Sequence, residues 1–195
     1  MKYELITILG PTAVGKTGLA AKLAYKFNGE IISADSRQVY KGMDIGTGKD
    51  IADYKIDGIK IPFHLIDILK PTEEFNLFRF KKEFDAAFSK IKKVDKAPFL
   101  VGGTGLYLSA VLKGYNLIDA DFKGDRNNQL MSLSKEELVE ILMKTNPEQH
   151  NTTDLKVKER IVKAIIVAEA EKDESKIKKS EAINSLVIGV SRSRD

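Results

Sequence analysis

The sequence of 195 residues contains no cysteine, so disulfide bonds and metal sites built from thiolates are excluded. No apolar run approaches the roughly 20 residues that an α-helix needs to cross a bilayer. The chain starts directly with a strand-like segment and shows no basic region or cleavage site of a signal peptide. With 43% hydrophobic and 31% charged residues, the composition is typical of a globular protein. We therefore expect a cytoplasmic protein that has no membrane-spanning segment.

A surplus of positive charge is present, but it is small. The chain carries 32 lysines and arginines against 28 acidic residues, which gives a net charge of +4. The pI is near 9.0. This balance suits contact with a nucleic acid or another polyanion, but it does not identify such a partner by itself.

Short apolar segments alternate with amphipathic ones over most of the chain. Apolar, β-branched segments predict strands at 3–9, 29–33, 97–101 and 185–190, and a short strand or extended segment at 61–68. Apolar residues at helical spacing predict helices at 15–27, from Asn76 through Ile91, and up to Leu112. Residues 36–55 have no clear period and predict a functional loop with short helical pieces. Alternating strands and helices favour an α/β fold, a parallel sheet flanked by helices.

After Gly114 the sequence becomes more polar. Residues 116–128 are expected to form a loop, and 169–179, almost entirely charged, a solvated helix end or a linker. Ser134 to Glu137 has the pattern of a capping box, and residues 151–154 are expected to cap another helix. We therefore expect a core at 1–114, a small helical insertion with a charged linker at 115–182, and the final core strand at 183–195.

The segment GPTAVGKT at Gly10–Thr17 fits the P-loop pattern and lies between a predicted strand and a predicted helix. Its glycines let backbone N–H groups point at phosphate oxygens, and the helix N-terminus adds a positive dipole. Lys16 can neutralise the terminal phosphates, and the Thr17 hydroxyl can ligate Mg²⁺. The segment predicts binding of a diphosphate or triphosphate by Gly10, Thr12, Ala13, Val14, Gly15, Lys16 and Thr17.

Two further segments should reach the same edge of the sheet, because parallel strands end on one side. Asp35 follows the second predicted strand. Its carboxylate could hold Mg²⁺ through water or act as a general base, and it could equally cap the following turn. Thr104 follows the third strand within Gly102–Gly105 and offers a hydroxyl beside backbone that a ligand can approach closely.

Four segments together resemble the tRNA dimethylallyltransferase family. They are Gly10–Thr17, SADSRQVYKGMDIGT at 33–47, PFHLID at 62–67 and VGGTGLYL at 101–108, and a weaker likeness continues over 150–167. The resemblance implies a P-loop NTPase-like fold. It also implies a Mg²⁺-dependent enzyme that transfers a dimethylallyl group from dimethylallyl diphosphate to N6 of an adenosine next to the tRNA anticodon (position 37). The expected partners are this donor and the anticodon stem-loop of tRNA, and we expect a monomer.

The resemblance also implies roles for individual residues. Asp35 would accept the N6 proton as the amine attacks, and Thr104 would hydrogen-bond at the amine or at the bridging oxygen. Lys16, Thr17 and Mg²⁺ would hold the diphosphate as it leaves. The adenosine would be flipped out of the anticodon loop to reach the site. Its contacts would come from Ser36, Arg37, Gln38 and Thr47, with Gln38 reading the base.

The chain departs from the family pattern in several places. The family usually reads GTAKP where this chain has Gly46–Asp50, and it usually has two histidines where this chain has Phe63-His64. We therefore expect His64 to be structural and paired with Asp67. A family carboxylate is absent at Ile166, and Arg160 matches a basic family position that is usually solvated. Family members continue for roughly a hundred further residues, so the chain is a fragment or a short relative that binds the diphosphate and transfers poorly.

Three other interpretations stay open. A P-loop kinase for a small molecule would bind ATP and would explain Gly10–Thr17 and Asp35, but not the segments at 36–47 and 101–108. A non-catalytic module that binds a diphosphate or a nucleic acid would be unaffected by Asp35→Ala, whereas an enzyme would lose turnover. The third keeps the prenyl transfer and replaces tRNA with free AMP as the acceptor.

Overall fold

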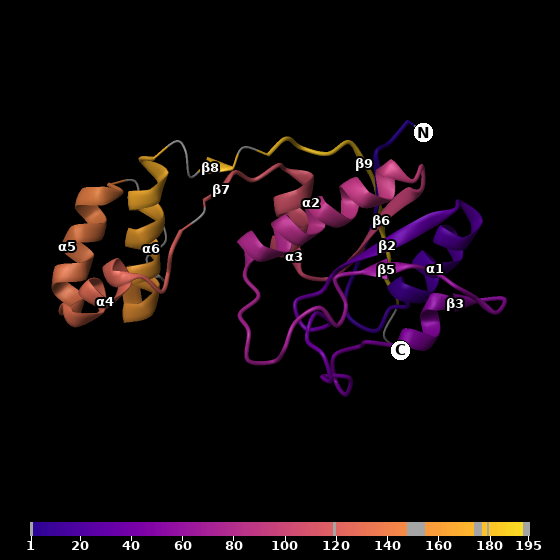
Figure 1. The fold of residues 1–195 in the computed structure, drawn as a ribbon, viewed down its shortest axis with the longest axis horizontal. Coiled ribbons are helices and arrows are strands. Elements are labelled where there is room, and N and C mark those ends of the chain that lie inside the picture. Colours follow the sequence, from indigo (N-terminus) through magenta and orange to yellow (C-terminus); the bar gives the residue numbers. More distant parts are fainter. Residues whose placement is uncertain (1, 119, 148–154, 174–176, 179, 193–195) are drawn as a thin grey trace. The chain divides into compact units, whose positions relative to one another are not determined.

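The computed structural model describes residues 2–118, 120–147, 155–173, 177–178 and 180–192 (Figure 1). The chain divides into two compact units. One comprises Met1–Tyr115 together with Glu181–Asp195, and the other comprises Asn116–Ser180. Along the sequence, the second unit is therefore inserted between the last helix and the last strand of the first. Each unit has its own hydrophobic core.

The first unit is built on a sheet of 5 strands in the order β5-β2-β6-β1-β9, with every pairing parallel. The strands are β1 (Leu5–Leu9), β2 (Gly29–Ala34), β5 (Phe63–His64), β6 (Ala97–Gly102) and β9 (Ser185–Gly189). Gly102 at the end of β6 lies opposite Ala34 in β2 and opposite Leu9 in β1. The three strands therefore end level with one another, and the segments that follow them meet at one edge of the sheet.

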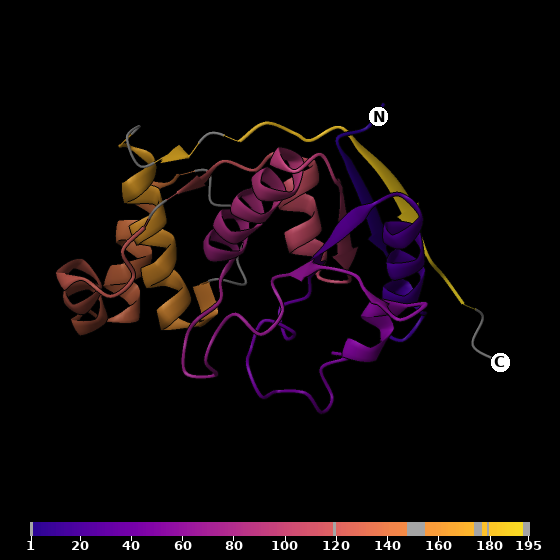
Figure 2. The same cartoon turned by 45° about the vertical axis from the view of Figure 1, so that its right-hand side comes forward.

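Helices cover both faces of this sheet, as Figures 1 and 2 show. Helix α1 (Lys16–Lys26) packs Ala20 and Ala24 on one face, against a cluster that includes Phe99. Helices α2 (Leu77–Lys93) and α3 (Gly105–Leu112) pack on the other face, where Phe80 stacks on Tyr107 at 4.2 Å between ring centroids. The predicted α/β fold class with a P-loop-type parallel sheet is confirmed.

The local signals read from the sequence explain where several elements begin. The Asn76 side chain accepts a hydrogen bond from the Arg79 N–H at 2.9 Å and caps α2 as expected. Residues 36–55 are largely irregular, as expected, and contain the short 3₁₀ helix η1 (Ile51–Tyr54). After η1, β3 (Lys55–Ile56) and β4 (Ile59–Lys60) form an antiparallel pair.

The second unit contains three helices among its described residues: α4 (Asp125–Ser132), α5 (Lys135–Thr145) and α6 (Lys158–Glu171). The capping box at Ser134 and Glu137 is confirmed. The cap expected at 151–154 lies outside the described residues. Nowhere in the described part of the chain is a helix long and apolar enough to cross a membrane.

Two expectations for the second unit were wrong in part. The loop expected at 116–128 contains β7 (Leu117–Ile118) and the start of α4. This polar segment is helical because Leu130, fully buried against α5 and α6, supplies packing that its sequence propensity does not reveal. Of the solvated helix end or linker expected at 169–179, the helix end is confirmed, since α6 runs to Glu171, but β8 (Ile177–Lys178), which pairs with β7, was not expected. Backbone pairing of this kind leaves no trace in a charge pattern.

The expected pairing of His64 with Asp67 was wrong. The His64 Nε2 atom lies 2.7 Å from Oε2 of Glu30, and the Lys96 ammonium donates to Oε1 of Glu30 at 2.8 Å. The strand register explains this, because His64 in β5 lies opposite Ile32 in β2, whose side chain points to the same face as that of Glu30. His64 therefore takes part in a structural cluster at the start of the strands.

This cluster predicts a pH-dependent contribution to stability. Burial raises the pKa of the Glu30 carboxyl, but hydrogen bonds from Lys96 and His64 outweigh it and bring the pKa below its usual 4.5. A carboxyl with a lowered pKa stabilises the fold above its unfolded pKa, and that stabilisation is lost as the pH falls through the folded value. We expect Glu30→Gln to lower the free energy of unfolding at neutral pH by about 1.5–3 kcal/mol.

Urea unfolding at neutral pH and at a pH below the usual carboxyl value tests this expectation. The difference between Glu30→Gln and the unaltered chain should shrink at the acidic pH. Glu140→Gln, at an exposed position on α5, is the matched control and should change little at either pH. An equal loss of stability at both pH values would show that the Glu30 charge does not act as described.

Candidate active site

A cavity of about 660 Å³ lies at the edge of the sheet where β1, β2 and β6 end. Its walls come from the P-loop, the residues that follow β2, residues 46–54 and the end of β6 with the residues after it. Of the site residues predicted from the sequence, only Val14 does not line it. The predicted residues that do are Gly10, Thr12, Ala13, Gly15, Lys16, Thr17, Asp35, Ser36, Arg37, Gln38, Thr47 and Thr104.

The conformation of the P-loop depends on its glycines and on the neighbouring edge strand. A Cβ atom on Gly10 would collide with the carbonyl oxygen of Val190, whose N–H bonds to Leu9 O at 2.8 Å. Ala13 and Gly15 have φ values of 65° and 84°, a left-handed geometry typical of backbone nests that bind anions. Gly15 is also the N-cap of α1 and has no side chain to occupy the first N–H groups of that helix. This end of the cavity therefore suits phosphate oxygens.

Lys16 supplies a cation at the same end. Its ammonium group donates to the carbonyl oxygen of Pro11 at 2.5 Å. Burial lowers the pKa of Lys16, and the nearby charge of Asp35 offsets part of that effect, so the pKa remains below its usual value. Lys16 and Asp35 line the same cavity, so the phosphate-binding end and this carboxylate share one environment.

Asp35 and Thr104 lie on two loops that are joined to each other. The Ser36 N–H donates to Oγ1 of Thr104 at 3.3 Å, and the Thr104 N–H donates to the Ala34 carbonyl at 3.3 Å. One oxygen of Asp35 accepts the Arg37 N–H at 2.9 Å, which is the turn-capping role that the sequence left open. A carboxylate has a second oxygen, so capping and proton transfer are compatible.

Tyr54, which sequence reasoning missed, lines the same cavity as Thr17, the metal-ligand candidate of the P-loop. Its side chain is buried. Burial raises the pKa of Tyr54 well above its usual value, and the charges of Asp53 and Asp35 add to the effect. Tyr54 therefore remains neutral and forms part of the cavity wall. No periodic pattern marks it, because it lies in the irregular stretch between β2 and β5.

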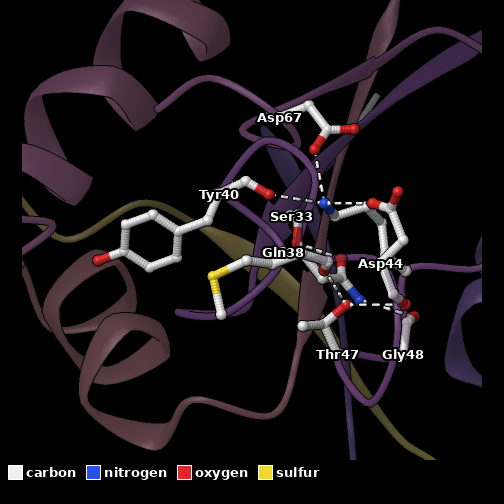
Figure 3. Close-up of polar contacts among 9 residues, drawn as sticks. Ser33, Gln38, Tyr40, Asp44, Thr47, Gly48 and Asp67 are labelled. Carbon is white, nitrogen blue, oxygen red and sulfur yellow. Dashed lines mark hydrogen bonds and ion pairs between the residues drawn. The ribbon is translucent and has the colours of Figure 1, made fainter. Parts of the chain in front are cut away.

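The wall formed by residues 38–48 is held by side-chain amide and hydroxyl contacts (Figure 3). The Gln38 amide accepts from the Ser33 hydroxyl at 2.9 Å and donates to the Gly48 carbonyl at 3.0 Å. The Thr47 hydroxyl donates to the Met43 carbonyl at 2.7 Å. The predicted base-reading residue Gln38 is thus itself fixed in the wall. A buried lysine, Lys49, which sequence reasoning also missed, lies behind this wall.

The oxygen donors in the cavity fit a magnesium ion. The Thr17 hydroxyl and the Asp35 carboxylate line the same space as the P-loop backbone. Within the described residues, no group of three or more His, Cys, Asp or Glu side chains could hold a metal ion. A cation here would therefore need phosphate oxygens of a ligand to complete its shell. Mg²⁺ characteristically binds this way, through one or two protein oxygens together with substrate phosphates.

Comparison with known families and proteins gives consistent matches along the chain. A family model described as IPP transferase matches residues 38–195, and one described as isopentenyl transferase matches residues 3–60. The tRNA dimethylallyltransferase 2 of Phocaeicola vulgatus is 48% identical over 195 residues, which are 100% of this chain and 63% of that protein. The chain thus spans less than two thirds of the length of this relative.

Two solved structures are also similar. The tRNA isopentenylpyrophosphate transferase of Bacillus halodurans is 34% identical, with a TM-score of 0.55, over 97% of this chain and 60% of that one. A eukaryotic dimethylallyltransferase described as acting on tRNA is 25% identical, with a TM-score of 0.69, over 95% of this chain and 48% of that one.

Proposed function

The chain belongs to the IPP transferase family, and on that premise we propose that it transfers a dimethylallyl group from dimethylallyl diphosphate to N6 of an adenosine beside the tRNA anticodon. One observation carries this proposal. The P-loop with Lys16, the carboxylate of Asp35 and the hydroxyl of Thr104 line one cavity. A leaving diphosphate and a nucleophile that must lose a proton therefore have their complementary groups within the same space.

The donor binds with its diphosphate in the P-loop. Backbone N–H groups around Ala13 and Gly15, the N-terminus of α1 and the Lys16 ammonium contact its oxygens. Negative charge grows on these oxygens as the bond between carbon and oxygen breaks, and groups fixed in advance stabilise that charge most effectively. Bound Mg²⁺, held by Thr17 and near Asp35, would add positive charge at the leaving group.

The chemical step joins the adenosine N6 to C1 of the dimethylallyl group. As the N6–C1 bond forms, the bond from C1 to the bridging oxygen breaks and inorganic diphosphate leaves. Asp35 accepts the proton that N6 loses, through the oxygen that does not cap the Arg37 turn. One lone pair of the Thr104 hydroxyl accepts the Ser36 N–H. The hydroxyl can therefore donate its proton to the bridging oxygen, or accept a hydrogen bond from the amine with its second lone pair.

The acceptor base approaches along the wall that Ser36, Arg37, Gln38 and Thr47 contribute. Gln38 presents an amide whose position is fixed by Ser33 and Gly48, which suits recognition of one base shape. The small positive net charge of the chain favours a polyanionic acceptor over a neutral one. These features support tRNA as the acceptor, and the cytoplasm is the compartment in which we place the reaction.

Calorimetric titration separates this proposal from a kinase. With Mg²⁺ present, dimethylallyl diphosphate is expected to bind at least about ten times more tightly than ATP, a difference near 1.4 kcal/mol. We expect this difference because the apolar tail of the allylic donor needs no site for a base or a ribose, whereas ATP needs both. Tighter binding of ATP, together with phosphorylation of a small acceptor, would favour a P-loop kinase and overturn the proposal.

A further inference from the structure

Lys49 is a buried cation beside the candidate active site. Its side chain is only 1% exposed. Its ammonium group donates to the carbonyl oxygen of Tyr40 at 2.7 Å and to carboxylate oxygens of Asp44 at 3.0 Å and Asp67 at 2.5 Å. A lysine ammonium has three N–H donors, so the group is fully satisfied. Figure 3 labels Tyr40, Asp44 and Asp67, the residues that supply these three acceptors.

These three acceptors lie in two segments, around residues 40–44 and at Asp67, that backbone hydrogen bonds already join in part. Asp67 follows β5, and its N–H donates to the Gln38 carbonyl at 3.1 Å, while the Lys41 N–H donates to the Leu69 carbonyl at 2.8 Å. Asp44 lies further along the wall, beyond these backbone contacts. Lys49 itself follows Gly48, whose carbonyl accepts a hydrogen bond from the Gln38 amide. One ammonium group thus connects Asp67 and Tyr40 to the part of the wall around Asp44 and Gly48.

The charge of Lys49 is retained because its partners outweigh its burial. Burial lowers the pKa of the ammonium group, but the hydrogen bonds that it donates to Asp67 and Asp44, together with their negative charges, raise it above the usual value. Both carboxylates are partly in water, with side chains 41% and 68% exposed, whereas the lysine is not. Removal of the ammonium would therefore release two hydrated carboxylates and a carbonyl. The Asp67 N–H would still bond to the Gln38 carbonyl, but the Gln38–Gly48 hydrogen bond would be left to hold residues 44–48.

We propose that Lys49 is a positioning residue that fixes the wall of residues 38–48 for the acceptor base, acting through Gln38 and Thr47. It does not line the cavity. The inference rests on the proposed prenyl transfer, since it assigns this wall to the acceptor. The P-loop, which holds the donor, is built on β1 and α1, and no hydrogen bond or ion pair among the described residues joins it to Lys49. Loss of Lys49 should therefore affect one substrate and spare the other.

The test is Lys49→Met, with Lys81→Met as a matched control. Lys81 is likewise a buried lysine with an ion pair, to Asp85 at 2.6 Å, but it belongs to α2. In Lys49→Met, KM for an anticodon stem-loop RNA should rise about 10- to 100-fold. The Kd for dimethylallyl diphosphate should stay within about twofold. Amide hydrogen exchange at Lys41 and Leu69 should accelerate about tenfold as their segment opens locally. Lys81→Met should change none of these.

Two results would overturn the proposal: unchanged exchange at Lys41 and Leu69, or an unchanged KM for RNA despite faster exchange. Failure of the prenyl transfer itself would look different, because the unaltered chain would then neither bind the donor nor modify RNA. In that case the exchange data alone would decide whether Lys49 anchors the wall. If Lys49→Met does not fold, Asp67→Asn takes its place, since it keeps the shape and removes one charge. It should raise KM in the same direction by a smaller factor.

Discussion

Replacement of Asp35 by asparagine is expected to slow transfer to RNA by about 10²- to 10⁴-fold, which is the usual contribution of a general base. An asparagine oxygen can still accept the Arg37 N–H that Asp35 accepts at 2.9 Å, so the turn after β2 should persist. The amide cannot take up the proton from N6. Binding of dimethylallyl diphosphate should therefore remain near that of the unaltered chain, and single-turnover kinetics with saturating donor should show the loss.

Asp57→Asn is the matched control for this change. Asp57 is exposed in the turn between β3 and β4, and its φ of 49° suits asparagine as well as aspartate. Its transfer rate should not change. If Asp35→Asn kept more than about a tenth of the transfer rate, the carboxylate would be a turn cap and not the base. A non-catalytic binding module would show no transfer with or without the substitution.

The second large effect is expected from Lys16→Met. The substitution removes the only lysine of the P-loop, whose charge interacts with that of Asp35. Charge-assisted hydrogen bonds to a diphosphate should be lost, so the Kd for dimethylallyl diphosphate should rise about 10- to 100-fold. The transfer rate at saturating donor should fall as well, because the charge on the diphosphate is greatest as it leaves.

Lys22→Met on the exposed side of α1 separates this local effect from a general loss of positive charge. It removes the same charge from the same helix at a distance from the P-loop, and its Kd should match that of the unaltered chain. Calorimetry and rapid-quench kinetics provide the two quantities. Similar weakening by Lys16→Met and Lys22→Met would mean that the diphosphate is attracted by net charge and not held in the P-loop.

The sequence predicted the parts of the site that follow from local pattern and strand direction. Gly10–Thr17 carries the spacing of a P-loop between an apolar strand and a helix. Asp35 and Thr104 come together because β2 and β6 are parallel neighbours that end level with each other. Neither inference needed the path of a long loop.

The remaining contacts depend on that path. Lys49 and Tyr54 belong to the stretch 36–69. Its largely irregular backbone has no sequence period from which the neighbours of a side chain could be inferred. The partner of His64 was assigned wrongly because proximity in sequence to Asp67 was weighed above strand register, which brings Glu30 beside it. The helix α4 was missed because burial of Leu130 depends on helices that come later in the chain.

The most direct test of the account is mass spectrometry of acceptors after incubation with the protein, dimethylallyl diphosphate and Mg²⁺. One arm contains an anticodon stem-loop RNA with an adenosine after the anticodon, another the same RNA with guanosine there, and a third AMP. The account predicts that only the first acceptor gains one five-carbon allyl group in place of a hydrogen, and that the group is on N6. Prenylated AMP with unmodified RNA, or phosphorylation by ATP with no prenylated product, would contradict it.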